Sequence, residues 1–287
     1  MSGGRDRFIP IDGQRLRVQI SGQGPPLLLI NGIGASVEMW RPLIDAMPQR
    51  QLVAFDLPGC GRSPAPTLPP RMRGLAALVA KLLISLRQKG LVEAPRGGID
   101  VLGYSFGGAV AQELAHRFPK SVRSLILCAT TPGIPSLPPN PIVAAMMLSP
   151  ARYYNETLGA LMIPHIVGGR TAKDREVLHR GLHQRLQRPP SIIGYAYQLY
   201  AITGWSSQPW LHRLSQPALV LHGDDDPVAP LFNARRMAQM IPHGRLHVLE
   251  GAGHLFLVDQ PEAAIPPIRS FLQRRSGRLA RSAGARQ

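Results

Sequence analysis

The sequence predicts an α/β fold, with a mainly parallel sheet, helices on both faces and a helical segment inserted after the sixth strand. Two observations carry this prediction. Short apolar runs alternate with stretches of helical spacing along most of the 287 residues, as in a parallel sheet covered on both faces. Between residues 131 and 210 a proline-rich opening leads into several helix-like stretches, which is too much chain for a plain loop.

The elements of the core can be placed in order. Two strands, at 7–11 and 15–21, flank the hairpin signal Asp12-Gly13. Short apolar runs predict further strands at 27–31, 51–55, 99–102, 124–128, 218–221 and 245–249. Helical spacing predicts helices at 37–47, 72–89 and 109–117, and another that begins at Pro261.

The inserted segment between residues 131 and 210 predicts how the chain is divided into regions. We expect residues 1–131 and 211–275 to form the core, residues 132–210 a helical cap, and residues 276–287 a basic disordered tail. Helix-like stretches within the cap lie at 142–147, 157–163, 172–186 and 191–200. Because the cap follows the sixth strand, it should lie at the carboxyl edge of the sheet, where ligands bind in such folds.

The cap is rich in apolar and aromatic residues, and about half of them are expected to form its own core. Some of the others are expected to line an apolar substrate channel. The candidates for binding substrate are Trp40 in the core and Tyr197 and Trp205 in the cap.

The net charge of +16 comes partly from an arginine-rich end without Asp or Glu. We favour a solvated, disordered tail. The alternative is contact with an anionic surface such as phospholipid headgroups. A nucleic-acid partner is not expected, because the tail has one aromatic residue, Phe271, and no recognition motif.

Composition also bears on the compartment. The first residues contain no apolar segment of a secretory signal, and no uncharged apolar stretch is long enough to cross a bilayer. The two cysteines, Cys60 and Cys128, fit a reducing cytosol better than a disulfide framework. We therefore expect a cytoplasmic protein without a transmembrane segment. A structural metal is not expected, because the cysteine spacing matches no zinc site.

The segment GYSFGG at residues 103–108 follows an apolar run and precedes a predicted helix. A strand, a sharp turn with serine at its apex and a helix make up the nucleophile elbow of the α/β-hydrolase fold. The turn raises the hydroxyl of Ser105 above the sheet, and flanking glycines let the helix pass close to the strand. Ser105 is therefore the candidate nucleophile.

A serine hydroxyl needs a base to become a good nucleophile, and in this fold the acid and then the histidine follow the serine along the chain. The segment HGDDDPV at 222–228 places an acid after a strand, and we choose Asp226. Asp224 and Asp225 are expected to make local backbone hydrogen bonds in the turn. Of nine histidines, only His254, in the loop after the last strand, has both the order and the position of the base.

An oxyanion needs backbone N–H donors. One is expected from Phe106, the residue after the nucleophile. The other is expected from Ile33, in the loop after the 27–31 strand. Asn31 stands at the start of that loop, and we expect its side chain to hold the loop in place without donating to the oxyanion.

Across residues 9–271 the sequence resembles the intracellular medium-chain-length polyhydroxyalkanoate depolymerases of bacteria. The segments that carry the resemblance are 28–35, 54–59, 148–153, 194–200, 204–205, 223–227 and 253–257. Those within the cap are the most specific, because the core motifs are shared by all hydrolases of this fold. The resemblance implies a serine esterase that cuts a storage polyester on cytosolic granules and needs no cofactor. The related polymer synthases use cysteine at the elbow, so Ser105 favours the hydrolases.

Three rival functions remain. The same triad would serve a triacylglycerol lipase or small-ester esterase, and also a hydrolase of this fold that cleaves carbon–carbon bonds. A granule-coat protein without activity is the third rival, and the complete triad argues against it. The sequence predicts a polyester or lipid-like ester substrate. Contact of the basic tail with a granule or an anionic surface is the alternative to a solvated tail.

Overall fold

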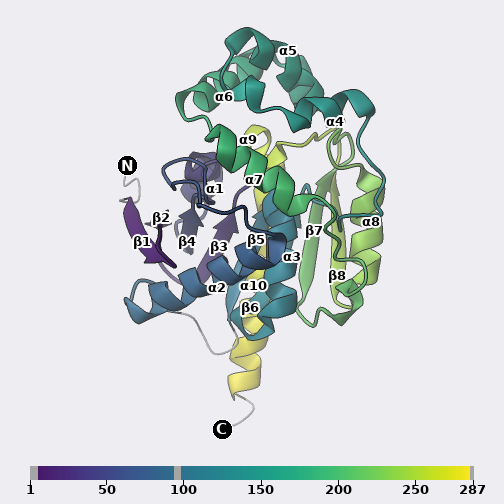
Figure 1. Cartoon of the computed structure of the whole chain (residues 1–287). Helices are drawn as coiled ribbons and strands as arrows, with labels where there is room; N and C mark the ends of the chain where they lie inside the picture. The colour runs from purple at the N-terminus through teal and green to yellow at the C-terminus, as the bar shows by residue number, and fades with distance from the viewer. Residues whose placement is uncertain (1–5, 94–97, 285–287) are drawn as a thin grey trace.

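An eight-stranded sheet forms the centre of the computed structural model, which describes residues 6–93 and 98–284 (Figure 1). The strands are β1 Arg7–Ile11, β2 Gln14–Ser21, β3 Pro26–Ile30, β4 Gln51–Phe55, β5 Ile99–Tyr104, β6 Val122–Cys128, β7 Ala218–Gly223 and β8 Gly244–Leu249. The helices of the core are η1 Val37–Trp40, α1 Arg41–Ala46, α2 Met72–Gln88, α3 Phe106–Arg117, η2 Pro119–Ser121, η5 Leu211–Arg213, α8 Leu231–Met240, α9 Phe256–Asp259 and α10 Pro261–Gly284.

The strands lie in the order β1-β2-β4-β3-β5-β6-β7-β8. β2 runs antiparallel to both of its neighbours, and the pairings from β4 across to β8 are all parallel. The prediction of a mainly parallel sheet is therefore confirmed. Because β5, β7 and β8 are parallel, their carboxyl ends meet at one edge of the sheet.

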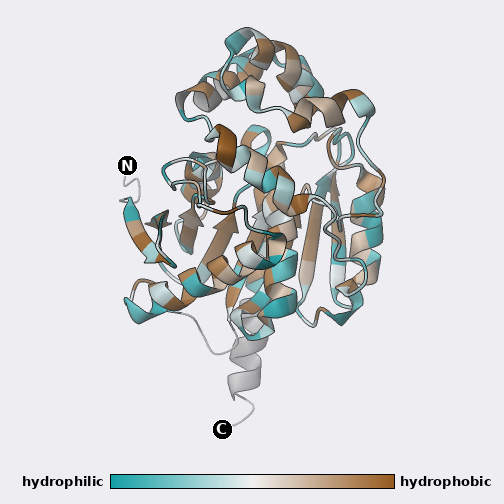
Figure 2. Ribbon diagram, viewed as in Figure 1, coloured by the Kyte–Doolittle hydropathy of each residue, from teal (hydrophilic) through white to brown (hydrophobic). Residues whose placement is uncertain are grey.

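Helices cover both faces of this sheet, so its central strands are apolar on both sides (Figure 2). In β3, Leu28 and Ile30 pack into one apolar cluster with residues of α2, α3 and α8. Leu27 and Leu29 point to the other face, where residues of α1 and α10 cover them. This two-sided burial explains why the strands appear in the sequence as continuous apolar runs.

Residues 132–210, which we call the cap, contribute α4 Pro141–Leu148, η3 Pro150–Tyr153, α5 Glu156–Val167, η4 Arg170–Lys173, α6 Arg175–Gln187 and α7 Ile192–Ile202. Figure 1 shows α4, α5 and α6 above the carboxyl edge of the sheet, with α7 between them and the core. Within the described residues, no helix combines the length and the apolar character that crossing a membrane requires.

The C-terminal end differs from the prediction. We expected disorder over 276–287, but α10 continues to Gly284. Leucine, alanine and arginine in this segment are good helix formers, and no proline follows Pro267. Residues 285–287 lie outside the described part of the chain.

Candidate active site

Ser105 sits at the sharp turn between β5 and α3. Its backbone has φ 51° and ψ −117°, a strained conformation for a residue with a side chain. Its N–H donates to the Cys128 carbonyl over 2.8 Å, which ties the turn to β6. A Cβ at Gly107 would lie 2.1 Å from the Ile30 carbonyl oxygen, so only glycine lets α3 approach β3 this closely.

The structure brings Ser105, His254 and Asp226 into one hydrogen-bonded row. His254 Nε2 lies 3.1 Å from Ser105 Oγ, and His254 Nδ1 lies 2.8 Å from Asp226 Oδ2. Asp226 and His254 are both buried. When Nδ1–H donates to the carboxylate, the lone pair of Nε2 faces the serine hydroxyl.

The Asp226 carboxylate is held in place by its own turn. Oδ1 accepts the N–H groups of Val228 and Ala229, each over 2.9 Å. His222 is fully buried beside this carboxylate, and its Nε2 lies 2.6 Å from the Ala229 carbonyl oxygen. Burial lowers the pKa of His222, although the charge of Asp226 works in the opposite direction. The ring therefore serves as a neutral support for the turn.

The side-chain hydrogen bonds of Asp224 and Asp225 are not local, as the sequence predicts, but long-range. Asp224 Oδ1 accepts the N–H of Gly251 over 2.7 Å, and Asp225 Oδ2 accepts the N–H of Gly169 over 3.1 Å. Both bonds reach loops far away in the sequence. Asp224 thus fastens the loop that carries His254, and Asp225 fastens the cap.

The cap also contacts the histidine loop directly. The Val167 carbonyl, at the end of α5, accepts the N–H of His254 over 2.6 Å. Three residues later the N–H of Arg170 donates to the Gly251 carbonyl over 3.0 Å. The position of His254 therefore depends on cap and core together.

The loop after β3 lies beside Ser105. The prediction that the Asn31 side chain holds this loop is confirmed, since Nδ2 donates to the Ala35 carbonyl and Oδ1 accepts from Trp40 Nε1. Ile33 lines the same cavity as Ser105. Phe106 begins α3, and first-turn N–H groups have no acceptor within their helix.

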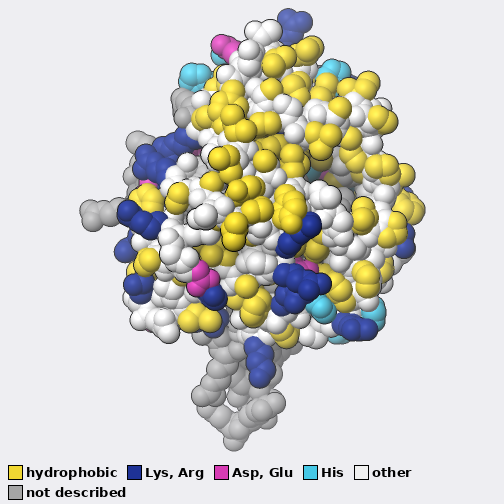
Figure 3. Space-filling view, viewed as in Figure 1, with side chains coloured by type: hydrophobic (Ala, Val, Ile, Leu, Met, Phe, Trp, Pro, Cys, Tyr) yellow, Lys and Arg dark blue, Asp and Glu magenta, His cyan; other side chains and the backbone are white. Residues whose placement is uncertain are grey.

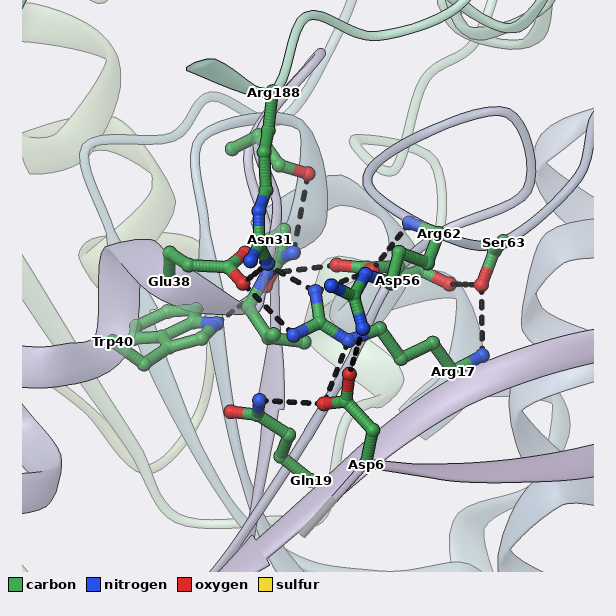
Figure 4. Close-up of polar contacts among 12 residues, drawn as sticks. Asp6, Arg17, Gln19, Asn31, Glu38, Trp40, Asp56, Arg62, Ser63 and Arg188 are labelled. Carbon is green, nitrogen blue, oxygen red and sulfur yellow. Dashed lines mark hydrogen bonds and ion pairs between the residues drawn. The ribbon is translucent and has the colours of Figure 1, made fainter. Parts of the chain in front are cut away.

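A charged network supports this loop from the side (Figure 4). The buried guanidinium of Arg17 pairs with Asp6 at 2.9 Å, Glu38 at 2.8 Å and Asp56 at 3.3 Å. Burial raises the pKa of the Asp56 carboxyl against the N–H groups of Arg62 and Val37 and the charge of Arg17. Glu38 also pairs with Arg188 of the cap. The network thus joins the cap to the core beside the cavity.

A cavity of about 150 Å³ opens over Ser105 and His254, between core and cap. Its apolar lining includes Met39, Met147, Tyr153, Ile166, Val177 and Leu178. Met39 comes from the core and the other five from the cap. The arrangement places the Ser105 hydroxyl and the His254 ring at the floor of a mainly apolar chamber, whose lining also includes Glu38, Arg152, Arg188 and Asp259.

The three predicted substrate-binding residues are not among those that line this cavity. Trp40 is buried against the edge of Tyr104, with Nε1 bonded to Asn31. Trp205 donates to Glu113 over 2.9 Å and packs against Trp210. Tyr197, in α7, also lies outside the lining. Aromatic size alone predicts these residues, but Trp40 and Trp205 use their N–H groups to hold the framework together.

Nothing in the described residues suggests a metal centre, since they hold no cluster of three or more His, Cys, Asp or Glu that could ligate an ion. Cys60 and Cys128 are free and buried. Burial raises the pKa of the Cys60 thiol to about 12 and that of Cys128 still further, so neither is a ready thiolate.

Comparison with known proteins agrees with this geometry. Residues 27–265 match the model of the alpha/beta hydrolase family. A poly(3-hydroxyalkanoate) depolymerase of Ectopseudomonas oleovorans is 41% identical over 93% of this chain and 92% of that protein.

Two solved structures are similar over nearly the whole chain. A thermophilic esterase from Thermogutta terrifontis has a TM-score of 0.77 and 27% identity, covering 94% of this chain and 99% of its own. The enol-lactonase from Burkholderia xenovorans LB400 has a TM-score of 0.79 and 24% identity, covering 93% and 100%, and it shows the fold alone. The chain therefore belongs to the alpha/beta hydrolase family and is an ester-bond hydrolase related to a poly(3-hydroxyalkanoate) depolymerase.

Proposed function

We propose that this protein is an intracellular depolymerase of medium-chain-length poly(3-hydroxyalkanoate). The observation that carries the proposal is the row from Asp226 through His254 to Ser105 at the floor of an apolar cavity. The 41% identity to a depolymerase supports the polymer over the other possible esters. A chamber lined by Met147, Ile166 and Leu178 suits an aliphatic side chain, since each buried CH₂ contributes about 0.8 kcal/mol.

In the proposed mechanism, Ser105 Oγ attacks the ester carbonyl while His254 Nε2 takes the hydroxyl proton. The N–H groups of Ile33 and Phe106 donate to the oxygen that becomes negative. Asp226 keeps Nδ1–H oriented and stabilises the imidazolium. The imidazolium then protonates the leaving alkoxide. This part of the polymer departs with a free hydroxyl group, while the other part stays on Ser105 as the acyl group. Water, deprotonated by His254, releases the acyl group as an acid and restores Ser105.

The outer surface of the cap supports an insoluble substrate. Ten large apolar side chains of the cap are exposed, and we call them the apolar cap surface: Ile134, Leu137, Ile142, Leu148, Tyr154, Leu158, Leu161, Ile192, Ile193 and Tyr200. Figure 3 shows hydrophobic side chains gathered over this upper part of the molecule. Exposed apolar surface of this extent is a mark of an interaction site.

The charge around most of the apolar cap surface indicates which surface it meets. Residues 131–151 and 189–211, which hold seven of its ten residues, contain no Asp, Glu, Lys, Arg or His, whereas the charged residues of the cap lie between 152 and 188. An anionic membrane would favour Lys and Arg at the contact, whereas an aliphatic polyester carries no charge. We therefore propose that the apolar cap surface rests on the solid polymer granule, with the cavity mouth beside it. Contact through the basic tail stays a prediction, because its side chains from Arg275 on lie outside those the structure describes.

The deciding experiment compares substrates. Purified protein is given a suspension of medium-chain-length polyhydroxyalkanoate and, separately, an emulsified long-chain triglyceride, and the released acid is titrated. We expect the polymer to be degraded and the triglyceride to be poor. Ser105→Ala is the control, and its rate should fall by about 10⁴-fold or more. Faster triglyceride hydrolysis would make the protein a lipase, and near-normal activity of Ser105→Ala would contradict the proposed nucleophile.

A further inference from the structure

Residues 32–35, beside Ser105, form a tight turn. The N–H of Ala35 donates to the Gly32 carbonyl over 3.2 Å, and Gly34 has φ +69° while Ile33 is not in the left-handed region. A positive φ at the third position alone is the mark of a type II turn. Types I and II differ mainly in which way the central peptide points, and here that peptide joins Ile33 to Gly34.

The cap holds both polar atoms of this central peptide. The Tyr153 hydroxyl, from η3, donates to the Ile33 carbonyl over 3.1 Å. The N–H of Gly34 donates to Gln198 Oε1, from α7, over 2.9 Å. One peptide plane is thus fixed at each end by a different cap element. Tyr153 also lies against Gly34, because a Cβ there would be 3.0 Å from its hydroxyl oxygen.

Both cap side chains are themselves fixed. Gln198 is 3% exposed, and its Nε2 donates to Cys60 Sγ over 3.0 Å, so its Oε1 is turned toward Gly34. The guanidinium of Arg152 lies 4.7 Å from the centre of the Tyr153 ring, and Nη2 donates to the Tyr195 hydroxyl over 2.9 Å. The two hydrogen bonds from the cap to the Ile33–Gly34 peptide are not needed to cover the cavity, since apolar side chains would cover it equally well.

We propose that Tyr153 and Gln198 are positioning residues that set the oxyanion hole from the cap. By holding the Ile33–Gly34 peptide in the type II orientation, they fix the adjacent Ile33 N–H relative to Ser105. The donor is then correctly directed only while η3 and α7 are seated on the core. The proposal rests on the proposed function, and it adds that covering the substrate and preparing the oxyanion hole are one event.

The test uses Tyr153→Phe, Gln198→Leu and the double variant, with a soluble medium-chain p-nitrophenyl ester. Loss of an oxyanion donor costs about 10²–10³ in kcat. For a misdirected donor we expect about a tenfold fall in kcat for each single variant and about a hundredfold fall for the double variant, with KM changed less than about twofold. A boronic acid with the same acyl chain forms a tetrahedral adduct on Ser105, and its Ki should weaken by the same factor as kcat/KM.

The matched control is Thr203→Val, which removes a hydroxyl that donates within the cap to the Leu199 carbonyl. It should leave kcat and the boronate Ki unchanged. Gln198→Glu keeps an oxygen for the Gly34 N–H, so it should retain more kcat than Gln198→Leu. Tyr153→Phe is nearly isosteric, so it decides the matter if Gln198→Leu does not fold.

The outcomes separate this proposal from the proposed function. Wild-type kcat and boronate Ki in Tyr153→Phe and Gln198→Leu, with an active parent protein, would overturn the positioning role alone. A fall in activity that appears in KM with an unchanged boronate Ki would also overturn it, because that pattern indicates lost substrate binding. If the parent protein hydrolyses no ester and is not labelled by a fluorophosphonate, the proposed function itself is wrong.

Discussion

The core hides most of its large apolar side chains, whereas the cap leaves many of them in water. Of the fifteen large apolar side chains exposed in the described part of the chain, ten belong to the cap. The core buries its apolar residues between a sheet and two layers of helices. The cap has a small apolar cluster of its own, centred on Ile163, Val167 and Leu182. This difference fits the proposal that part of the cap's apolar surface contacts the polymer.

The two regions nevertheless meet at the site through polar contacts. The cap contributes the acceptor for the His254 N–H, the donor to Asp225 and the two bonds to the Ile33–Gly34 peptide. Variants in the core and in the cap should therefore fail in different ways. Core variants of the triad should lose every substrate, while cap surface variants should lose only the insoluble one.

The largest effect is expected at the core. Asp226→Asn should lower kcat by about 10³–10⁴-fold on soluble and insoluble esters alike, because the imidazole loses the carboxylate that orients it. The measurement is the rate on a p-nitrophenyl ester and on polymer. Asp225→Asn is the matched control, and its loss should be far smaller. A more severe loss in Asp225→Asn would show that the acid had been misplaced.

The next effect should separate the two substrates. The double variant Ile192→Asp with Ile193→Asp removes two exposed side chains of the apolar cap surface. Asp at the N-terminus of α7 suits the helix dipole, so stability should hold. Fully burying one such side chain contributes about 1.5–3 kcal/mol. We therefore expect polymer hydrolysis and granule binding to fall at least about tenfold, with soluble ester turnover unchanged.

Ile84→Asp provides the control for this pair, because Ile84 is an exposed apolar residue of α2 in the core. It should leave polymer hydrolysis unchanged. Equal losses in the cap and core variants would mean that the cap has no special contact with the polymer. Binding to anionic vesicles in preference to polymer would contradict the proposed partner.

A smaller effect is expected in the cavity. Val177→Thr places a hydroxyl in the apolar lining with little change of volume. In the wild type, kcat/KM should rise from acetyl to octanoyl esters, by up to about fourfold for each CH₂ that is buried. The variant should flatten this rise and spare acetyl ester turnover. Val248→Thr, in β8 and away from the cavity, is the control. A wild-type preference for acetyl esters would contradict the medium-chain assignment.

The sequence predicted the core better than the cap for a physical reason. Strand ends, the GYSFGG turn and the order of Ser105, Asp226 and His254 are local patterns, and the sheet brings them to one edge. The lining of the cavity depends on how the cap helices pack on the core, which no local pattern encodes. Trp40, Tyr197 and Trp205, the residues chosen from the sequence, are accordingly not among those that line the cavity. Tyr153 and Gln198 lie in two of the three cap segments that carry the family resemblance, and that resemblance is the one available signal.

Helix ends show the same limit of local patterns. The sequence predicts a helix-like stretch at 157–163, but α5 continues through Pro164 to Val167. A proline removes one N–H donor and strains the preceding turn. The additional turn brings the Val167 carbonyl to the N–H of His254. The favourable contact is with a loop 87 residues later in the chain, so the nearby sequence could not reveal it.

The smallest expected effect concerns the pH dependence of stability. His222 is fully buried and burial lowers its pKa from the usual 6.5. The unfolded chain therefore binds a proton near pH 6.5 that the folded protein does not, and stability falls as the pH drops below that value. The slope for one proton is at most about 1.4 kcal/mol per pH unit. His222→Gln keeps a donor for the Ala229 carbonyl but cannot titrate. Urea unfolding between pH 7 and pH 5 should show a shallower loss of stability in this variant, and equal slopes would mean that other groups carry the dependence.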